Sequence, residues 1–156
     1  MPAEAPRPER AIHLLNTHTN ESLNVVFKRG GEYDAAALLA LDKLLRDHRN
    51  DEVTSMDPRL FDQLADLADA AHCQPTFEVI SAYRSPASNA KMSTPGSGVA
   101  KKSMHVTGRA VDVRLRSCLC DDLRDLAIAA AKGGVGYYKR SDFVHLDTGA
   151  FRTWVG

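Results

Sequence analysis

Hydrophobic and polar residues alternate along two neighbouring segments near the N-terminus. The segments 11–17 and 22–28 carry this two-residue period on either side of the polar turn Thr19-Asn20-Glu21. Side chains of a strand point alternately to its two faces, so the pattern predicts two strands, each with one buried face. The short polar turn between them favours an antiparallel hairpin.

A helical period follows the hairpin. Asp34 is a suitable N-cap for a helix that continues to about Arg49, and Leu38, Leu41 and Leu45 share one face of it. This face is expected to pack on the core.

A second helix is predicted to begin at Asp57-Pro58, because proline is tolerated in the first helical turn. Its apolar positions recur at helical spacing and comprise Leu60, Leu64, Leu67, Ala68 and Ala71. Packing against the core explains this stripe without a cofactor site.

The remaining pattern predicts strands at 77–82, 110–115, 135–138, 143–147 and 151–155, and helices at 86–92 and 121–132. The segment between the helix at 86–92 and Lys102 is rich in Ser, Thr, Pro, Gly and Lys, which is typical either of a binding loop or of a plain surface connection. Strands and helices in this order predict a single α+β domain with a mainly antiparallel central sheet flanked by helices.

Length and charge narrow the possible partners. The chain has 156 residues, within the single-domain range, and its 20 basic and 20 acidic residues cancel. The balance gives no indication of nucleic acid or an anionic membrane as partner, and no apolar run reaches the roughly 18 residues of a membrane-spanning helix. We expect a monomer whose residues 11–156 form the domain.

Residues 1–10 are rich in Pro, Glu and Ala without apolar periodicity, and this composition predicts a disordered leader. No signal peptide is visible in this segment. Cys118 and Cys120 are too close in the sequence to favour a disulfide between them, so we expect all three cysteines to be free, with Cys73 a small core residue. A metal site formed by Cys118, Cys120 and a histidine is an alternative.

Two separated segments carry candidate metal ligands. In 103–112, His105 and Gly108 precede Asp112, which alternates with the apolar residues of a predicted strand. In 141–147, His145 lies among carboxylates on another strand. Two imidazoles and one carboxylate with an open fourth position form the ligand set of a catalytic zinc, and a buried carboxylate needs such a partner. A structural or surface His–Asp pair is the alternative.

These motifs resemble a known family. The pattern Ser-x-His-x-x-Gly-x-Ala-x-Asp, followed downstream by acid-x-x-His, is similar to the zinc D,D-peptidases of the lysostaphin and D-alanyl-D-alanine metallopeptidase superfamily. The segments 16–19, 44–49, 79–86 and 133–149 resemble its murein endopeptidase K branch. The resemblance covers nearly the whole chain after residue 10 and implies a hedgehog/D,D-peptidase-like fold.

The resemblance also implies roles for single residues. His105, Asp112 and His145 match the ligands of one zinc ion, and Asp142 stands where the family places the catalytic acid, often a glutamate. Arg84 matches the arginine that stabilises the oxyanion.

The choice of general base is open between two aspartates. Strand alternation puts Asp147, not Asp142, on the face of His145. We nevertheless expect Asp142 to turn inward from the preceding turn and act as base, with Asp147 orienting a ligand imidazole or serving as the alternative base. Ser103 and Tyr83, which adjoin the two motifs, are expected to bind substrate.

The resemblance therefore implies a zinc-dependent peptidoglycan endopeptidase that hydrolyses cross-links between stem peptides outside the cytoplasm, in the periplasm or cell wall. Two alternatives stay open: a D,D- or L,D-carboxypeptidase on uncross-linked stems, and a non-catalytic wall-binding domain. The cross-link type is not predicted. Cobalt or nickel could occupy the same ligand set as zinc.

Overall fold

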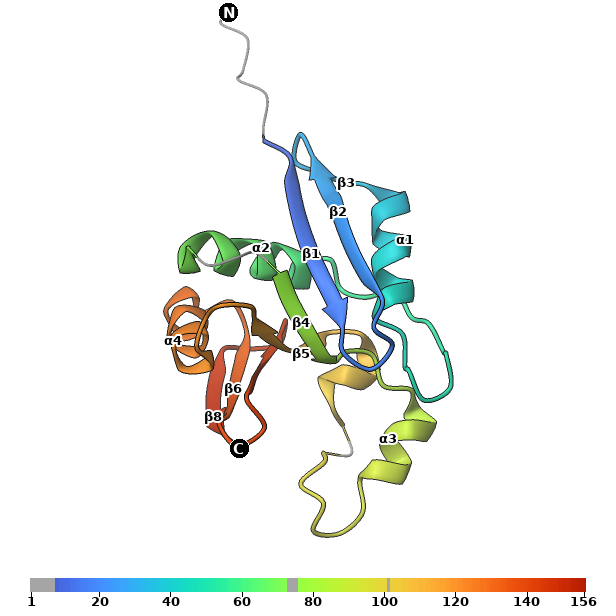
Figure 1. The fold of residues 1–156 in the computed structure, drawn as a ribbon. Helices are drawn as coiled ribbons and strands as arrows, with labels where there is room; N and C mark the ends of the chain where they lie inside the picture. The colour runs from blue at the N-terminus through green and yellow to red at the C-terminus, as the bar shows by residue number, and fades with distance from the viewer. Residues whose placement is uncertain (1–7, 73–75, 101) are drawn as a thin grey trace, which may run out of the picture.

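A computed structural model describes residues 8–72, 76–100 and 102–156. These residues form one eight-stranded sheet, with the strand order β3-β2-β1-β4-β5-β7-β6-β8, and the helices that pack on it (Figure 1). The strands are β1 (Arg10–Asn16), β2 (Ser22–Arg29), β3 (Glu32–Tyr33), β4 (Thr76–Ser81), β5 (Ala110–Leu115), β6 (Gly134–Tyr138), β7 (Phe143–Asp147) and β8 (Arg152–Val155). The helices are α1 (Ala35–Leu44), α2 (Arg59–Ala71), α3 (Pro86–Met92) and α4 (Cys120–Ala130), together with a 3₁₀ turn, η1 (Met104–Thr107).

The predicted α+β class with a mainly antiparallel sheet is confirmed. β1 and β2 form the expected hairpin, in which Leu14 pairs with Leu23. Parallel pairing occurs between β1 and β4 and between β6 and β8, and the other neighbours are antiparallel. The β1–β4 pair is parallel because the chain crosses over through α1 and α2 between these strands.

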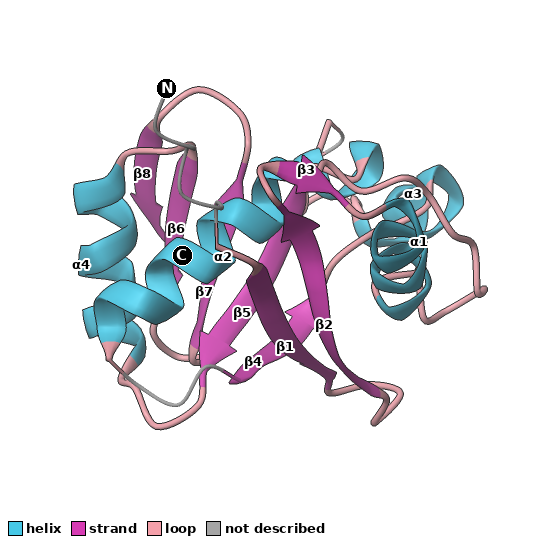
Figure 2. Cartoon of the chain, turned by 90° about the horizontal axis from the view of Figure 1, so that it is seen from above, coloured by secondary structure: helices cyan, strands magenta, loops and turns pink. Residues whose placement is uncertain are grey.

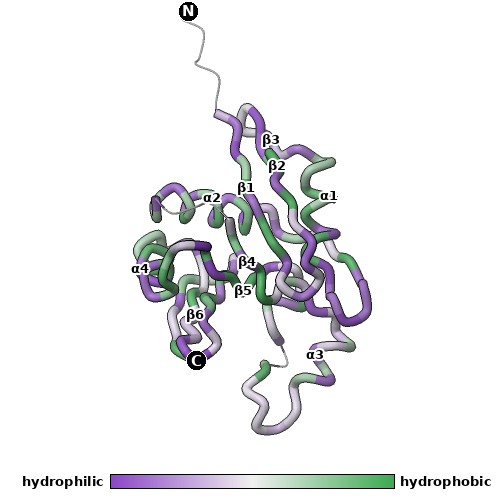
Figure 3. The backbone as a smooth tube through the Cα atoms, viewed as in Figure 1, coloured by the Kyte–Doolittle hydropathy of each residue, from purple (hydrophilic) through white to green (hydrophobic). Residues whose placement is uncertain are grey.

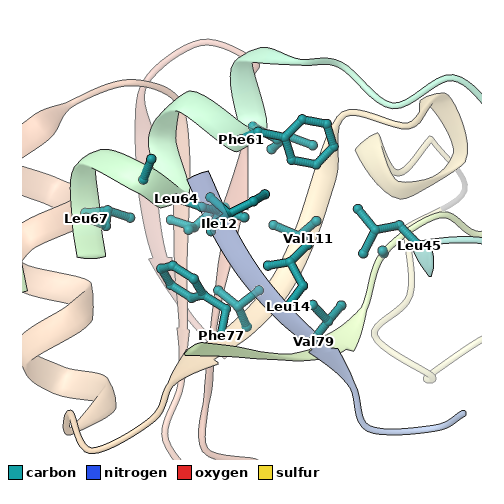
Figure 4. Packing of buried hydrophobic residues seen from close by; sticks show 14 of the residues in the cluster. Ile12, Leu14, Leu45, Phe61, Leu64, Leu67, Phe77, Val79 and Val111 are labelled. Atoms are coloured by element: carbon teal, nitrogen blue, oxygen red, sulfur yellow. The ribbon is translucent and has the colours of Figure 1, made fainter. Parts of the chain in front are cut away.

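The hydrophobic core lies between the sheet and the helices α1, α2 and α4. Phe61 and Leu64 of α2 pack over Leu14 of β1, Phe77 of β4 and Val111 of β5, all buried (Figure 4). Figure 2 shows α2 and α4 lying against the sheet, and in Figure 3 the apolar segments gather where β4, β5 and β6 meet the helices. The alternate residues of the central strands are therefore free to form a polar site on the other face.

The first helix is shorter than the sequence predicts. Asp34 caps it as expected, by accepting a hydrogen bond from the amide of Ala37, but it ends at Leu44 rather than near Arg49. The helix ends here because the side chain of Asp47 is fully buried and accepts hydrogen bonds from the backbone amides of Ser85 and Arg49. A tertiary contact thus overrides the local helical pattern.

The two-residue strand β3 was not predicted, and the other predicted elements agree with the structure within one or two residues. One difference affects the candidate site, because the segment expected as a loop before β5 contains the 3₁₀ turn η1. Most of the expected leader 1–10 lies outside the described residues, although Arg10 already belongs to β1.

The expectation that all cysteines are free is wrong. Cys118 is disulfide-bonded, whereas Cys120 is free and buried at the start of α4. The expected core position of Cys73 lies outside the described residues. Among the helices that are described, none combines the length and apolar character needed to cross a membrane.

Candidate metal centre

The turn η1 positions His105. The Ser103 hydroxyl accepts a hydrogen bond from the His105 amide at 3.2 Å and so caps the turn. Gly108 ends it in the left-handed conformation, with φ of 70°. A Cβ atom at Gly108 would also stand 2.9 Å from the carbonyl oxygen of Ser55, so both the backbone angle and the close packing require glycine here.

The pairing of β5 and β7 positions the other two candidate ligands. Asp112 and His145 are directly opposed in this antiparallel ladder, so their side chains lie on the same face of the sheet. Their neighbours Val111, Val113 and Val144 point into the core on the other face. The two-residue period of each strand therefore separates core from site.

The structure brings His105, Asp112 and His145 together. Asp112 Oδ1 lies 3.2 Å from His105 Nε2 and 3.0 Å from His145 Nδ1, and the three ligand atoms lie within 4.8 Å of one another. All three residues are buried. Oxygen and imidazole nitrogen atoms at this separation fit one tetrahedral zinc ion with a fourth position open.

The outer nitrogen of each histidine supports the same assignment. His105 Nδ1 lies 2.7 Å from the carbonyl oxygen of Ala82, and His145 Nε2 lies 2.8 Å from Asp147 Oδ2. Both oxygen atoms are acceptors, so each histidine can donate a proton outward and would present the nitrogen that faces Asp112, without its proton, to a bound metal ion. This is the tautomer that a metal ligand requires, and such outer acceptors hold the ligand ring in place.

The pKa values at this cluster reflect close opposite charges. Burial opposes ionisation of Asp112, but His105 and His145 outweigh it and hold the pKa of Asp112 well below its usual range. Burial lowers the pKa of His145, whereas hydrogen bonds to Asp112 and Asp147 raise it, and the net direction is upward. A metal ion would compete with protons for the His145 nitrogen, so its binding is expected to weaken as the pH falls.

Asp147 is fully buried and joins His145 to the following loop. Its Oδ1 accepts hydrogen bonds from the amides of Gly134 and Gly149 at 2.9 and 3.0 Å. The guanidinium of Arg152 donates to both carboxylate oxygens at 3.1 and 2.8 Å. Although burial opposes its ionisation, these bonds and the one to His145 hold the pKa of Asp147 well below its usual range. Asp147 is therefore an anion in position to orient His145.

Arg84 lies beside the cluster, and its guanidinium is only partly hydrogen-bonded within the described residues. It is 8 % exposed, and its Nη1 donates to Asn89 Oδ1 at 3.1 Å, whereas its buried Nε has no hydrogen-bond partner among the described residues. Its amide donates to the carbonyl oxygen of His105 at 3.1 Å, which ties the arginine segment to the turn η1. Burial lowers the pKa of Arg84, and the charge of Asp112 opposes this shift. A fixed, largely buried guanidinium next to candidate metal ligands is suited to stabilise negative charge on a substrate oxygen.

The structure does not bring Asp142 to the cluster. Asp142 lies in the turn before β7 with φ of 59°, and its side chain is 64 % exposed. Its described contacts are with Arg114, at 3.4 Å, and with the thiol of Cys120. The inward turn expected from the sequence is not seen, because the left-handed backbone at Asp142 directs its carboxylate toward Arg114 and α4.

The two residues expected to bind substrate have structural contacts. Ser103 is half-buried and caps η1. Tyr83 is partly buried against the core, and burial raises the pKa of its hydroxyl.

One residue beside the cluster was not anticipated. The ring centroid of Trp154 on β8 lies 5.0 Å from that of His145, and the indole N–H donates to the Tyr138 hydroxyl at 2.9 Å. Gly136 makes room for this ring, since a Cβ atom there would lie 2.5 Å from Trp154. The sequence signal is indirect, because it depends on the parallel register of β6 and β8, which places Gly136 beside Trp154.

The chain is similar in sequence to known peptidoglycan endopeptidases. The family described as "Peptidoglycan L,D-endopeptidase MepK" matches residues 4–154. The peptidoglycan L,D-endopeptidase MepK of Escherichia coli (strain K12) is 41% identical over 149 residues, which are 96% of this chain and 81% of that protein. A protein of Haemophilus influenzae named as a probable peptidoglycan L,D-endopeptidase MepK is 38% identical over 152 residues, 97% of this chain and 81% of its own length.

No solved structure gives a significant match. The family match covers almost the whole chain, including every residue of the His–Asp–His cluster, Arg84 and Asp147. This chain therefore belongs to the peptidoglycan L,D-endopeptidase MepK family.

Proposed function

We propose that this protein is a metal-dependent murein endopeptidase that hydrolyses peptide cross-links between stem peptides of peptidoglycan. The observation that carries the proposal is the buried cluster of His105, Asp112 and His145 next to Arg84, whose backbone amide donates to the carbonyl oxygen of His105. The relatives are named L,D-endopeptidases, so we propose that the scissile bond joins an L-centre to a D-centre.

We propose His105, Asp112 and His145 as the metal ligands. Zinc is favoured because imidazole and carboxylate ligands suit it and hydrolysis needs no redox chemistry. A bound zinc ion would supply an activated water and polarise the scissile carbonyl. Ala82 and Asp147 hold the two imidazoles so that their unprotonated nitrogens face the ion.

Arg84 is proposed to bind the carbonyl oxygen as negative charge develops on it. A donor that is already fixed and buried stabilises such charge without having to reorganise during the reaction. The contacts with Asn89 and His105 provide this fixation, since they hold one end of the guanidinium and the backbone amide.

Two aspartates compete for the role of general base. The family pattern points to Asp142, three residues before His145, whereas the geometry places Asp147 next to His145. Asp147 has its carboxylate oxygens engaged by Gly134, Gly149, Arg152 and His145, which favours an orienting role. Asp142 stays our prediction for the base, to be tested directly.

Substitution of Asp142 by Asn provides that test. If Asp142 takes the proton of the attacking water, the variant keeps its zinc and fold, and turnover falls about a hundred- to ten-thousandfold. Zinc content, melting temperature and turnover are measured on the same preparation. Near-wild-type turnover would instead assign Asp142 to the turn that it occupies.

The substrate implies action outside the cytoplasm, in the periplasm or cell wall. The disulfide at Cys118 supports this location, because disulfides persist in oxidising compartments. Stem peptides are the proposed partner, and the protein is expected to act as a monomer.

The decisive experiment incubates purified protein with peptidoglycan sacculi, with and without chelator, and identifies released muropeptides by mass. Cleavage of cross-linked dimers to monomers supports an endopeptidase, and defined 4–3 and 3–3 dimers separate D,D from L,D cleavage. Trimming of uncross-linked stems alone would favour a carboxypeptidase. Binding to sacculi without released fragments in zinc-replete buffer would refute the enzyme and favour a wall-binding domain.

A further inference from the structure

Three successive backbone amides anchor the segment that carries Arg84. The amide of Tyr83 donates to the carbonyl oxygen of Leu45, that of Arg84 to the carbonyl oxygen of His105, each at 3.1 Å, and that of Ser85 to Asp47 Oδ2 at 2.9 Å. Two of these three acceptors belong to the turn that follows α1. This turn therefore holds the arginine segment against the candidate metal centre.

Asp47 is the buried carboxylate of this turn, and the proposed mechanism does not use it. Its side chain is fully buried, and besides the Ser85 amide it accepts hydrogen bonds from the Arg49 amide at 3.0 Å and the Arg49 guanidinium at 3.4 Å. Burial opposes its ionisation, but hydrogen bonds from Ser88, Ser85 and Arg49 outweigh burial and hold the pKa of Asp47 well below its usual range. The turn thus places a fixed negative charge against the backbone amide of Ser85, the residue that follows Arg84.

Ser85 transmits this anchoring to the other end of the arginine side chain. Its hydroxyl accepts hydrogen bonds from the Asn50 side chain at 3.0 Å and from the Ser88 amide at 3.2 Å, and so caps α3. One turn further along α3, Asn89 accepts the hydrogen bond from Arg84 Nη1. A shift of Ser85 would consequently disturb both the backbone of Arg84 and the residue that holds its guanidinium.

We propose that Asp47 is a positioning residue for the hydrolytic reaction, which holds Arg84 in place by fixing Ser85 and the start of α3. The inference rests on the proposed function, in which Arg84 binds the developing oxyanion. Asp47 does not touch substrate in this scheme. Its effect on catalysis passes through the placement of the guanidinium.

The variant Asp47→Asn tests the inference. Asparagine has the same shape, but its amide group must turn donors toward either the Ser85 amide or the donors of Arg49. A displacement of about 1 Å at a catalytic group can cost about a hundredfold in rate, so we expect kcat to fall about ten- to a hundredfold. KM and zinc content should change little, because the metal ligands keep their own contacts.

Asp42→Asn is the matched control. Asp42 is also a buried carboxylate near the end of α1, and it accepts a hydrogen bond from the Met56 amide at 2.9 Å. Burial raises the pKa of Asp42, so its charge is not held as that of Asp47 is. This variant should leave kcat unchanged even if it alters the melting temperature.

A double-mutant cycle separates positioning from general stability. If Asp47 acts through Arg84, adding Asp47→Asn to Arg84→Lys should lower kcat little further, because coupled residues are not additive. Additive losses, or an unchanged kcat per zinc-loaded folded molecule in Asp47→Asn, would overturn the inference. Should Asp47→Asn not fold, Asn50→Ala replaces it, since the side-chain amide of this exposed residue donates a hydrogen bond to the Ser85 hydroxyl.

For Asn50→Ala, a lower kcat that is not additive with Arg84→Lys supports the inference, and an unchanged kcat overturns it. Wild-type activity in the same muropeptide assay is the reference for every variant. A wild-type protein that releases no fragments would refute the proposed function itself, whereas an active wild type with a fully active Asp47→Asn variant would refute only the positioning role.

Discussion

Replacement of Asp147 by Asn separates a residue that orients a ligand from one that transfers a proton. Asparagine can still accept the hydrogen bonds from Gly134 and Gly149 through its remaining oxygen. Its amide group would then face His145 Nε2 and the guanidinium of Arg152, which are both donors. Two charge-assisted hydrogen bonds are lost, and the outer proton of His145 loses its acceptor.

The contacts give the size of the expected effect. A hydrogen bond to a charged group contributes about 1.5–3 kcal/mol, and we discount the Arg152 contribution because that side chain is 46 % exposed. We therefore expect the metal-free variant to lose about 2–4 kcal/mol of its free energy of unfolding. For a chain of this size, that corresponds to a melting temperature lower by roughly 4–16 °C. Zinc affinity should fall about ten- to a hundredfold, as for other outer partners of metal-bound histidines.

The pH dependence of stability follows from the lowered pKa of Asp147. A carboxyl group whose pKa is lower in the folded state adds stability above its unfolded pKa, near 3.9, and this stability is lost as the pH falls toward the folded-state pKa. The difference in stability between wild type and Asp147→Asn should therefore be full at neutral pH and shrink below about pH 4.

Thermal unfolding in chelator, zinc titration and muropeptide release are measured on the same variant. For stability and zinc affinity, Asp142→Asn is the control, because it makes the same chemical change at an exposed turn position, where substitutions usually alter stability by less than about 0.5 kcal/mol. An Asp147→Asn protein with wild-type stability and zinc affinity but no turnover would refute the orienting role and make Asp147 the base.

Three further predictions concern the metal, the arginine and the aromatic neighbour. Chelation should lower the melting temperature, because the proposed zinc would bind only the folded state, and His105→Ala should bind no stoichiometric zinc, as checked by metal analysis. Arg84→Lys keeps the charge but loses the planar donor group, so kcat should fall about a hundred- to a thousandfold with little change in KM, whereas a purely structural arginine predicts unchanged turnover per folded molecule. Gly136→Ala should displace Trp154, the only tryptophan, shift its fluorescence to longer wavelength and cost about 1–3 kcal/mol of stability; an unchanged spectrum would contradict the packing.

The sequence predicts most strands and helices because their periods are local. The alternation in β1, β2 and β5 and the leucine stripe of α2 identify these elements and their buried faces. The end of α1 is missed because Asp47 leaves the helix to bind Ser85, 38 residues away in the chain, and no local pattern reveals that contact. The disulfide at Cys118 is missed for the same reason, since spacing in the sequence does not report distance in space.

The candidate ligands could be predicted from residue types, their order and the family resemblance. The groups that orient and surround these ligands could not. The carbonyl oxygen of Ala82 that orients His105 has no side-chain signal, and the indole of Trp154 reaches His145 only through the parallel pairing of β8. Strand alternation alone gave the correct face for Asp147. Resemblance gave a role to Asp142 that the position of its side chain does not explain.

Two different physical causes can place an aspartate at position 142. One is chemistry, since a carboxylate three residues before His145 matches the family pattern for a general base. The other is the backbone, since φ is 59° here and Asp and Asn are the non-glycine residues that best tolerate the left-handed conformation. Asn satisfies the second cause but not the first. Because of this, Asp142→Asn distinguishes the two by turnover alone, without a change in fold that would complicate the result.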